Sequence, residues 1–228
     1  AFAGCNDGAI NVDPDHPVFA VIDDALYNKQ TKELLAAPVH VITIPEGIVS
    51  IGDYAFHYFE RISLSTKTKD QIILPSTVTS IGNYAFAGGR RIVVLPDNLQ
   101  SIGDYAFWET YGVKNAIPDS VSHLGIGAFH YTNCPDYDPT YAIKITATSN
   151  LHEIPDYAFA GCTWVKIDAS NIYALGDYAF YNCSSLVEVY CKATTPPDLG
   201  SDVFNEYCSC YFLGLFLAHK DVQRDHCS

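Results

Sequence analysis

The chain has 228 residues and is acidic, with 26 Asp and Glu against 13 Lys and Arg and a formal net charge of −13. This charge repels a phosphate backbone, so we do not expect a nucleic acid partner. Hydrophobic residues make up 48% of the chain, which is enough for a continuous core. The longest apolar run, residues 211–218, is far shorter than the ~20 residues that cross a bilayer, so no membrane span is expected.

The N-terminal residues 1–5 read Ala-Phe-Ala-Gly-Cys, as residues 158–162 do. Because they match the interior of a repeat and lack the pattern of a signal peptide, we expect the native chain to begin upstream. Short apolar segments on both sides of the polar stretch 28–32 predict a β-hairpin at about 18–37. The interval between the repeat phenylalanines Phe2 and Phe56 is too long for one coil, so this hairpin is predicted to be inserted between coils.

One pattern then repeats along the chain: an apolar stretch that ends in Pro in the early copies, two apolar positions three apart, and a phrase of the type Ile-Gly-Asp-Tyr-Ala-Phe. The phenylalanines that close the phrases are Phe56, Phe86, Phe107, Phe129, Phe159, Phe180 and Phe204. Their shorter intervals fall in the range of about 20–29 residues that is typical of one leucine-rich repeat. The two longest intervals, which end at Phe86 and Phe159, predict loops at 65–70 and 134–139.

The chemistry of the repeat predicts the path of one coil. β-Branched residues before Pro favour a short strand, and Pro ends it. Glycine then permits a turn, and Ala-Phe returns the chain to the core on a helical or 3₁₀ bend. Three cysteines, Cys5, Cys162 and Cys183, each follow a repeat phenylalanine at the third position, so we predict that they are buried thiols.

The repeat resembles the BspA-like leucine-rich repeat proteins, also called the Treponema pallidum-type or LRR_5 group. The resemblance covers most of residues 1–204 and is carried by Ile44-Pro45 to Phe56, Leu74-Pro75 to Phe86, Leu95-Pro96 to Phe107 and Leu175 to Cys183. Residues 18–37 and 189–199 look like those of members from Bacteroides and relatives. The resemblance implies a secreted or surface-exposed protein that adheres to host proteins or other bacteria. Its motif is structural, so no binding residue transfers from it.

The predicted fold is an α/β repeat solenoid, a right-handed leucine-rich repeat superhelix. A parallel β-sheet is expected on one face, and short strands or 3₁₀ turns on the other. The solenoid is predicted to occupy residues 1–204, including the inserted hairpin. Residues 205–228 are predicted to be an atypical C-terminal tail.

The sequence offers little for catalysis or metal binding. The cluster of metal-ligand residue types in the tail lacks the spacing of a common zinc site, and consists of Cys208, Cys210, His219, His226 and Cys227. The pairs of acidic residues lack the spacing of a calcium loop. Nucleophile-elbow, phosphate-loop and His-Glu-x-x-His motifs are absent from the sequence. We therefore expect no metal, no cofactor and no enzyme activity.

Two surfaces are candidate binding sites. One tyrosine recurs in five coils, so coil stacking predicts a column of Tyr54, Tyr84, Tyr105, Tyr157 and Tyr178. Either the rings pack along the solenoid edge with their hydroxyl groups in water, or they form an aromatic stripe for a protein or glycan. The second surface is a row of outward positions that vary between coils, represented by His123, Glu153 and Tyr173.

The expected function is a non-catalytic extracellular module for protein recognition or adhesion. Its expected partner is a host matrix protein or another bacterial surface protein. Two alternatives remain: a structural spacer that displays other domains, and a glycan-binding surface protein.

Overall fold

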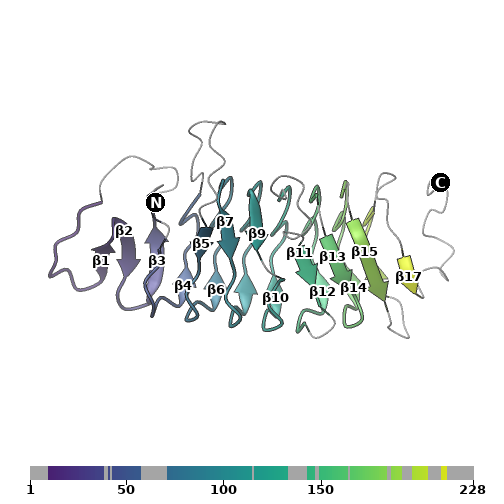
Figure 1. Ribbon diagram of the computed structural model, residues 1–228, viewed down its shortest axis with the longest axis horizontal. Coiled ribbons are helices and arrows are strands. Elements are labelled where there is room, and N and C mark those ends of the chain that lie inside the picture. The colour runs from purple at the N-terminus through teal and green to yellow at the C-terminus, as the bar shows by residue number, and fades with distance from the viewer. Residues whose placement is uncertain are drawn as a thin grey trace.

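The computed structural model describes residues 10–38, 41, 43–57, 71–114, 116–132, 143–146, 149–163, 165–183, 186–191, 197–204 and 212–214. Its coils follow one another along a single long axis, from β1, β2 and β3 at one end to β17 at the other (Figure 1). The described residues form strands and turns and no helix. The predicted solenoid with parallel sheets is therefore confirmed, and the face opposite the longer strands carries short strands.

Four sheets line the two faces of the solenoid. On one face, a seven-stranded sheet contains β1 (Phe19–Ile22), β2 (Ala25–Asn28), β3 (Glu33–Ala36), β4 (Ser50–Ile51), β6 (Ser80–Ile81), β8 (Ser101–Ile102) and β10 (His123–Leu124). It is followed by a three-stranded sheet of β12 (Glu153–Ile154), β14 (Ala174–Leu175) and β16 (Asp198–Leu199). The other face has a sheet of β5 (Gln71–Ile73), β7 (Ile92–Val94) and β9 (Gly112–Lys114), and a sheet of β11 (Ile143–Ile145), β13 (Val165–Asp168), β15 (Leu186–Cys191) and β17 (Phe212–Gly214).

One coil illustrates how the repeat folds. After β7 the chain turns at Pro96, whose carbonyl accepts the Leu99 N–H at 3.2 Å. It passes through β8 on the opposite face and returns to β9 through the turn at residues 104–109. Proline suits the position before this turn because it has no N–H and so ends the hydrogen bonding of the strand.

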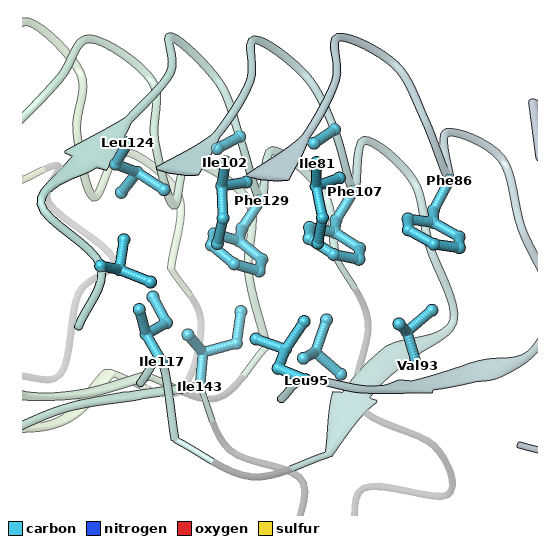
Figure 2. Packing of buried hydrophobic residues seen from close by; sticks show 14 of the residues in the cluster. Ile81, Phe86, Val93, Leu95, Ile102, Phe107, Ile117, Leu124, Phe129 and Ile143 are labelled. Atoms are coloured by element: carbon cyan, nitrogen blue, oxygen red, sulfur yellow. The ribbon is translucent and has the colours of Figure 1, made fainter. Parts of the chain in front are cut away.

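A column of phenylalanine rings fills the centre of the solenoid. Figure 2 shows Phe86, Phe107 and Phe129 between short-strand residues such as Ile102 and apolar residues from the other face such as Leu95. Ring centroids of successive phenylalanines lie 4.9–5.5 Å apart from Phe56 to Phe204, and each pair of ring planes is within 12° of parallel. The column keeps its register across both long intervals of the sequence, as predicted. The loops expected at 65–70 and 134–139 lie outside the described residues.

The segment predicted as one hairpin contains three strands. Asp23 and Asp24 both have positive φ, 48° and 64°, which is the geometry of a type I′ turn between β1 and β2. A second turn leads to β3, which pairs in parallel with β4 through Glu33 and Ser50. The first turn was not predicted, because residues 18–27 resemble one apolar segment in the sequence. The three strands extend the solenoid sheet at its N-terminal end.

Both faces are interrupted at the same coil. Strand β10 does not pair with β12, and β9 does not pair with β11. In the turns beside this gap, hydrogen bonds between the coils continue, because the N–H groups of Gly127, Phe129 and Tyr131 donate to the next coil at 2.8–2.9 Å. The Ile117 N–H also donates to the Lys144 carbonyl at 2.9 Å. The turns therefore hold the array together where the strands do not.

Candidate functional site

The turns that follow the short strands form one continuous edge of the solenoid, which we call the tyrosine edge. It consists of residues 53–57, 83–88, 104–109, 126–131, 156–161, 177–182 and 201–204. The repeat tyrosines of this edge lie in the left-handed region, with φ between 52° and 59° at Tyr54, Tyr84, Tyr105, Tyr157 and Tyr178. Gly127 takes the same position in the fourth coil with φ 58°. This conformation costs a non-glycine residue about 1–2 kcal/mol, so contacts between coils must hold the tyrosines there.

This geometry corrects the role predicted for the repeat glycine. The sequence analysis assigned the turn to the glycine of each phrase, but the left-handed residue is the tyrosine two positions later. The glycine is required because the preceding coil lies against it. A Cβ on Gly125 would lie 2.4 Å from the backbone nitrogen of Asp104 and 2.4 Å from the carbonyl carbon of Gly103. A side chain on Gly125 would therefore force these two coils apart, whereas the fifth coil, which follows the gap between β10 and β12, has Pro155 at this position.

Hydrogen bonds between coils explain both the backbone conformation and the acidic residue of the phrase. The N–H of Tyr84 donates to the carbonyl of Asp104 at 2.9 Å, and the Phe86 N–H donates to Ala106 at 2.8 Å. In the opposite direction, Oδ1 of Asp53 accepts the Asn83 N–H at 2.7 Å. The same side-chain bond recurs along the edge and joins the pairs Asn83–Asp104, Asp104–Ile126, Asp156–Asp177 and Asp177–Ser201. Each of these coils is thus fastened to the next on this edge.

The tyrosine rings form two stacks rather than one column. Tyr54, Tyr84 and Tyr105 stack with centroids 5.1 Å apart, and Tyr157 stacks on Tyr178 at 5.0 Å. Between the stacks, Gly127 carries no ring, and the Tyr105 ring covers the space that its Cβ would fill. Stacked neighbours cover both faces of the Tyr84 ring and one face of each of the other four rings.

A second row of aromatic residues lies beside the tyrosines and was missed by the sequence analysis. It occupies the third position after each tyrosine or its equivalent, where the residues are His57, Ala87, Trp108, His130, Ala160 and Tyr181. His130 bridges the gap between the tyrosine stacks, with ring centroids 6.3 Å from Tyr105 and 5.9 Å from Tyr157. Each residue of this row directly follows a repeat phenylalanine in the sequence, so the row could have been predicted from the same repeat register as the tyrosines.

The tyrosine edge carries negative charge only. Its charged residues are Asp53, Asp104, Glu109, Asp156, Asp177 and Asp202, and it contains no Lys or Arg. Burial lowers the pKa of His57 and of His130, so both imidazoles are neutral at neutral pH, although Glu109 opposes the effect at His130. The pKa of Tyr84 is raised by burial and then by neighbouring tyrosines and Asp104, so its hydroxyl stays protonated. The edge therefore combines neutral aromatic groups with six carboxylates.

The second candidate surface is less concentrated. His123, Glu153 and Tyr173 are all exposed on or beside the short strands, but His123 lies on β10 and Glu153 on β12, which do not pair. Only two of the three are brought together: a hydrogen bond to Glu153 raises the pKa of Tyr173. The Tyr173 ring, 57% exposed, also stacks on His152 at 5.9 Å.

The predicted thiols have a structural role. Cys162 and Cys183 are buried thiols, as predicted, whereas Cys5 lies outside the described residues. Their sulfurs donate to the Phe129 and Phe159 carbonyls at 2.9 and 3.0 Å. Thr132 occupies the same position and donates to the Phe107 carbonyl at 2.7 Å, which explains why either Cys or Thr can stand there. Burial raises the pKa of the Cys162 thiol well above its ordinary value, so this group is not a nucleophile.

Within the described ranges, no three His, Cys, Asp or Glu side chains gather as a metal site, and no helix is long and apolar enough to cross a membrane. The cysteine and histidine cluster of the C-terminal tail lies outside those ranges. The geometry offers surfaces for contact with another molecule and assembles no reactive group in the part of the chain that the structure describes.

These stacked parallel coils define a leucine-rich repeat solenoid, and comparison with known proteins gives the family. The family described as "BspA type Leucine rich repeat region (6 copies)" matches residues 63–141 and 137–215, about two thirds of the chain. The chain belongs to this BspA-type leucine-rich repeat family, as its sequence indicated. A comparison with curated proteins finds no match.

Solved structures share the architecture at low sequence identity. The pneumococcal vaccine antigen PcpA is 19% identical with a TM-score of 0.57, over 90% of this chain and 45% of that protein. A leucine-rich repeat protein from Bacteroides ovatus is 22% identical (TM-score 0.45; 86% and 62% covered), and the T. pallidum protein TpLRR is 20% identical (0.43; 83% and 85%). The PcpA match supports the fold, and the chain spans less than half of PcpA's length.

Proposed function

We propose that the chain is a non-catalytic recognition module that acts outside the cell and binds another protein through the tyrosine edge. The observation that carries this proposal is the second aromatic row. Ala87 and Ala160 show that a methyl group satisfies the coil at this position. The side chains of Trp108 and Tyr181 are therefore larger than the packing of the coil requires. Tyr181 is 42% exposed. Exposed tyrosine and tryptophan are enriched where proteins bind each other.

The resemblance to PcpA, which is described as a vaccine antigen, supports an extracellular setting. The partner class we propose is a host matrix protein or another bacterial surface protein. A spacer that only displays other domains is the alternative from a different class. Such a spacer needs a stiff array but gains nothing from aromatic side chains at positions where alanine suffices.

The stacked geometry also bears on the glycan alternative. Sugars bind aromatic residues mainly by packing their C–H faces on exposed ring faces. In this stack, rings within 16° of parallel cover both faces of Tyr84 and one face each of Tyr54 and Tyr105. The tyrosine edge is therefore better suited to a protein, which can use the ring edges, hydroxyl groups and carboxylates.

The test is binding of the purified chain to a panel of matrix proteins and glycans. We expect a protein ligand whose binding is weakened at least about tenfold in a Trp108→Ala, Tyr181→Ala double variant, because central aromatic contacts contribute about 1–2 kcal/mol or more each. The matched control is a His123→Ala, Tyr173→Ala variant on the sheet face, which should bind normally. No binding to any panel member would support the spacer, and glycan retention lost in the double variant would support the glycan alternative.

A further inference from the structure

We propose that the partner contacts the tyrosine edge with an arginine- and lysine-rich segment in an extended conformation. This inference rests on the proposed function and specifies the chemistry of the partner. It follows from what the edge offers to an incoming molecule: six carboxylates, a row of phenol hydroxyl groups, and no positive charge along residues 53–57, 83–88, 104–109, 126–131, 156–161, 177–182 and 201–204.

The carboxylates retain the capacity to accept further hydrogen bonds. In the bonds between coils, Oδ1 of Asp53, Asp104, Asp156 and Asp177 accepts one backbone N–H each. A carboxylate has two oxygens and about four lone-pair sites, so the acceptor capacity is only partly used. The side chains of Arg and Lys carry only donors, and Arg presents five N–H groups in a planar fork. The donor-only partner matches the acceptor-rich edge.

The aromatic row adds contact area beside these carboxylates. Tyr131 is 44% exposed and Tyr157 37% exposed, and both stand on the same edge as Asp156. The flat guanidinium group and the methylene stems of Arg and Lys pack well against such rings while the charged ends reach carboxylates. This arrangement favours a basic segment over a purely aliphatic one.

The spacing along the edge also favours long side chains. Successive tyrosine rings within a stack are 5.0–5.1 Å apart, which gives about 25 Å from Tyr54 to Tyr178, the length of about eight extended residues. An extended chain repeats its side chains on one face about every 6.7 Å, so ring spacing and peptide spacing do not match. Long flexible side chains tolerate this difference, whereas short rigid ones do not.

Charge also argues against other occupants. A second copy of the chain would bring another −13 charge toward the acidic edge, and a phosphate-rich surface would be repelled in the same way. Exposed lysines such as Lys114 and Lys144 lie on strands β9 and β11 and not on the tyrosine edge, so self-association through them is an outcome that the experiment measures.

The structure supplies a substitution that removes charge and keeps the fold. Asn83 stands where four other coils have Asp, and its Oδ1 accepts the Asp104 N–H at 2.8 Å just as a carboxylate does. A fourfold variant, Asp53→Asn, Asp104→Asn, Asp156→Asn and Asp177→Asn, therefore removes four charges without breaking the bonds between coils. The matched control removes four exposed charges away from the edge, Asp15→Asn, Glu46→Gln, Asp97→Asn and Asp198→Asn.

The experiment measures binding of a synthetic Arg-Ser repeat peptide of about eight residues, together with any protein found in the panel, to the wild type and both variants. We expect binding of the peptide that weakens with rising ionic strength and falls about tenfold or more in the edge variant, because four exposed ion pairs are lost. The control variant should change the affinity less than about threefold. A Glu-Ser peptide should not bind.

The outcomes separate the inference from the proposed function. If a panel protein binds the wild type and the edge variant equally well, recognition stands and the basic-segment inference is overturned. Equal weakening in the edge and control variants overturns it too, because attraction would then follow net charge alone. If the Arg-Ser peptide binds at the edge but no panel protein does, the inference is supported and the proposed partner class fails. If the mass of the wild type in analytical ultracentrifugation rises with concentration and that of the edge variant does not, a second copy is the occupant and the inference is overturned.

Discussion

Replacing Phe107 by alanine tests whether the phenylalanine column carries the stability of the array. The Phe107 side chain is 0% exposed and its ring stacks on two neighbours, at 5.3 Å from Phe86 and 5.1 Å from Phe129. Phenylalanine-to-alanine changes in well-packed cores cost about 3–5 kcal/mol, and each aromatic pair contributes about 0.5–1.5 kcal/mol beyond burial. Two lost pairs place the expected loss at the upper end, about 4–5 kcal/mol. At this chain length that corresponds to a fall in Tm of about 8–20 °C.

The matched comparison is Phe204→Ala at the end of the described column. Phe204 is only partly buried and its ring stacks on Phe180 at 5.5 Å, so we expect a smaller loss of about 1–3 kcal/mol. Urea unfolding followed by circular dichroism and by tyrosine fluorescence measures both variants and shows whether each array unfolds in one transition. Equal losses at Phe107 and Phe204, or an unchanged midpoint for Phe107→Ala, would refute the idea that stacking between neighbouring coils holds the solenoid.

Three further substitutions test local features of the coil by the same unfolding assay. Gly125→Ala should cost about 2–3 kcal/mol, because its Cβ would meet the preceding coil's backbone at 2.4 Å, and normal stability would show that the coils separate easily. The Tyr84→Gly variant should be more stable than Tyr84→Ala by about 1 kcal/mol, because both lose the stacked ring but only glycine accepts a φ of 53° without strain. The reverse order would contradict the left-handed backbone at this position. The Cys162→Thr variant should lose less than about 1 kcal/mol of stability, whereas Cys162→Val should lose about 1–2 kcal/mol because it removes the donor to the Phe129 carbonyl. Equal losses would show that this hydrogen bond does not explain why Cys162 stands there.

Each of these tests concerns one coil and its two neighbours. In a repeat array, stability is close to a sum of coil and interface contributions. Partial unfolding at the gap between β10 and β12 would appear as a second transition, since these two strands do not pair and the coils are joined there by hydrogen bonds of the turns and by the stacked phenylalanines. That outcome would locate the weak interface without affecting the comparison between Phe107 and Phe204.

The sequence predicted the repeat, its register and the buried phenylalanines because these depend on spacing and on the hydrophobic effect. A phenylalanine that returns at a fixed place in every coil must stack on its equivalents once the coils stack, even where a long interval separates Phe129 from Phe159. The same reasoning correctly placed Cys162 and Cys183 in the core. It failed at the Asp23-Asp24 turn, where two acidic residues inside an apolar segment were not recognised as a turn between strands.

The candidate site was predicted only in outline. Five tyrosines at one repeat position were correctly expected to approach one another, but the sequence did not show their left-handed backbone, the covered ring faces or the break at Gly127. The aromatic row with Trp108 and Tyr181 was also missed. These features depend on how one coil lies against the next.

The sequence by itself determined that this protein is a repeat solenoid, because periodic burial of Ile, Ala and Phe leaves few other ways to form a core, and its repeat phrases resemble those of the BspA type. Only the tertiary structure decided what faces the solvent on its edge. The backbone bonds between coils set a spacing of about 5 Å, and that spacing turns single tyrosines into stacks and single aspartates into a row of carboxylates. Such a surface belongs to the stack of coils and not to any one copy of the repeat.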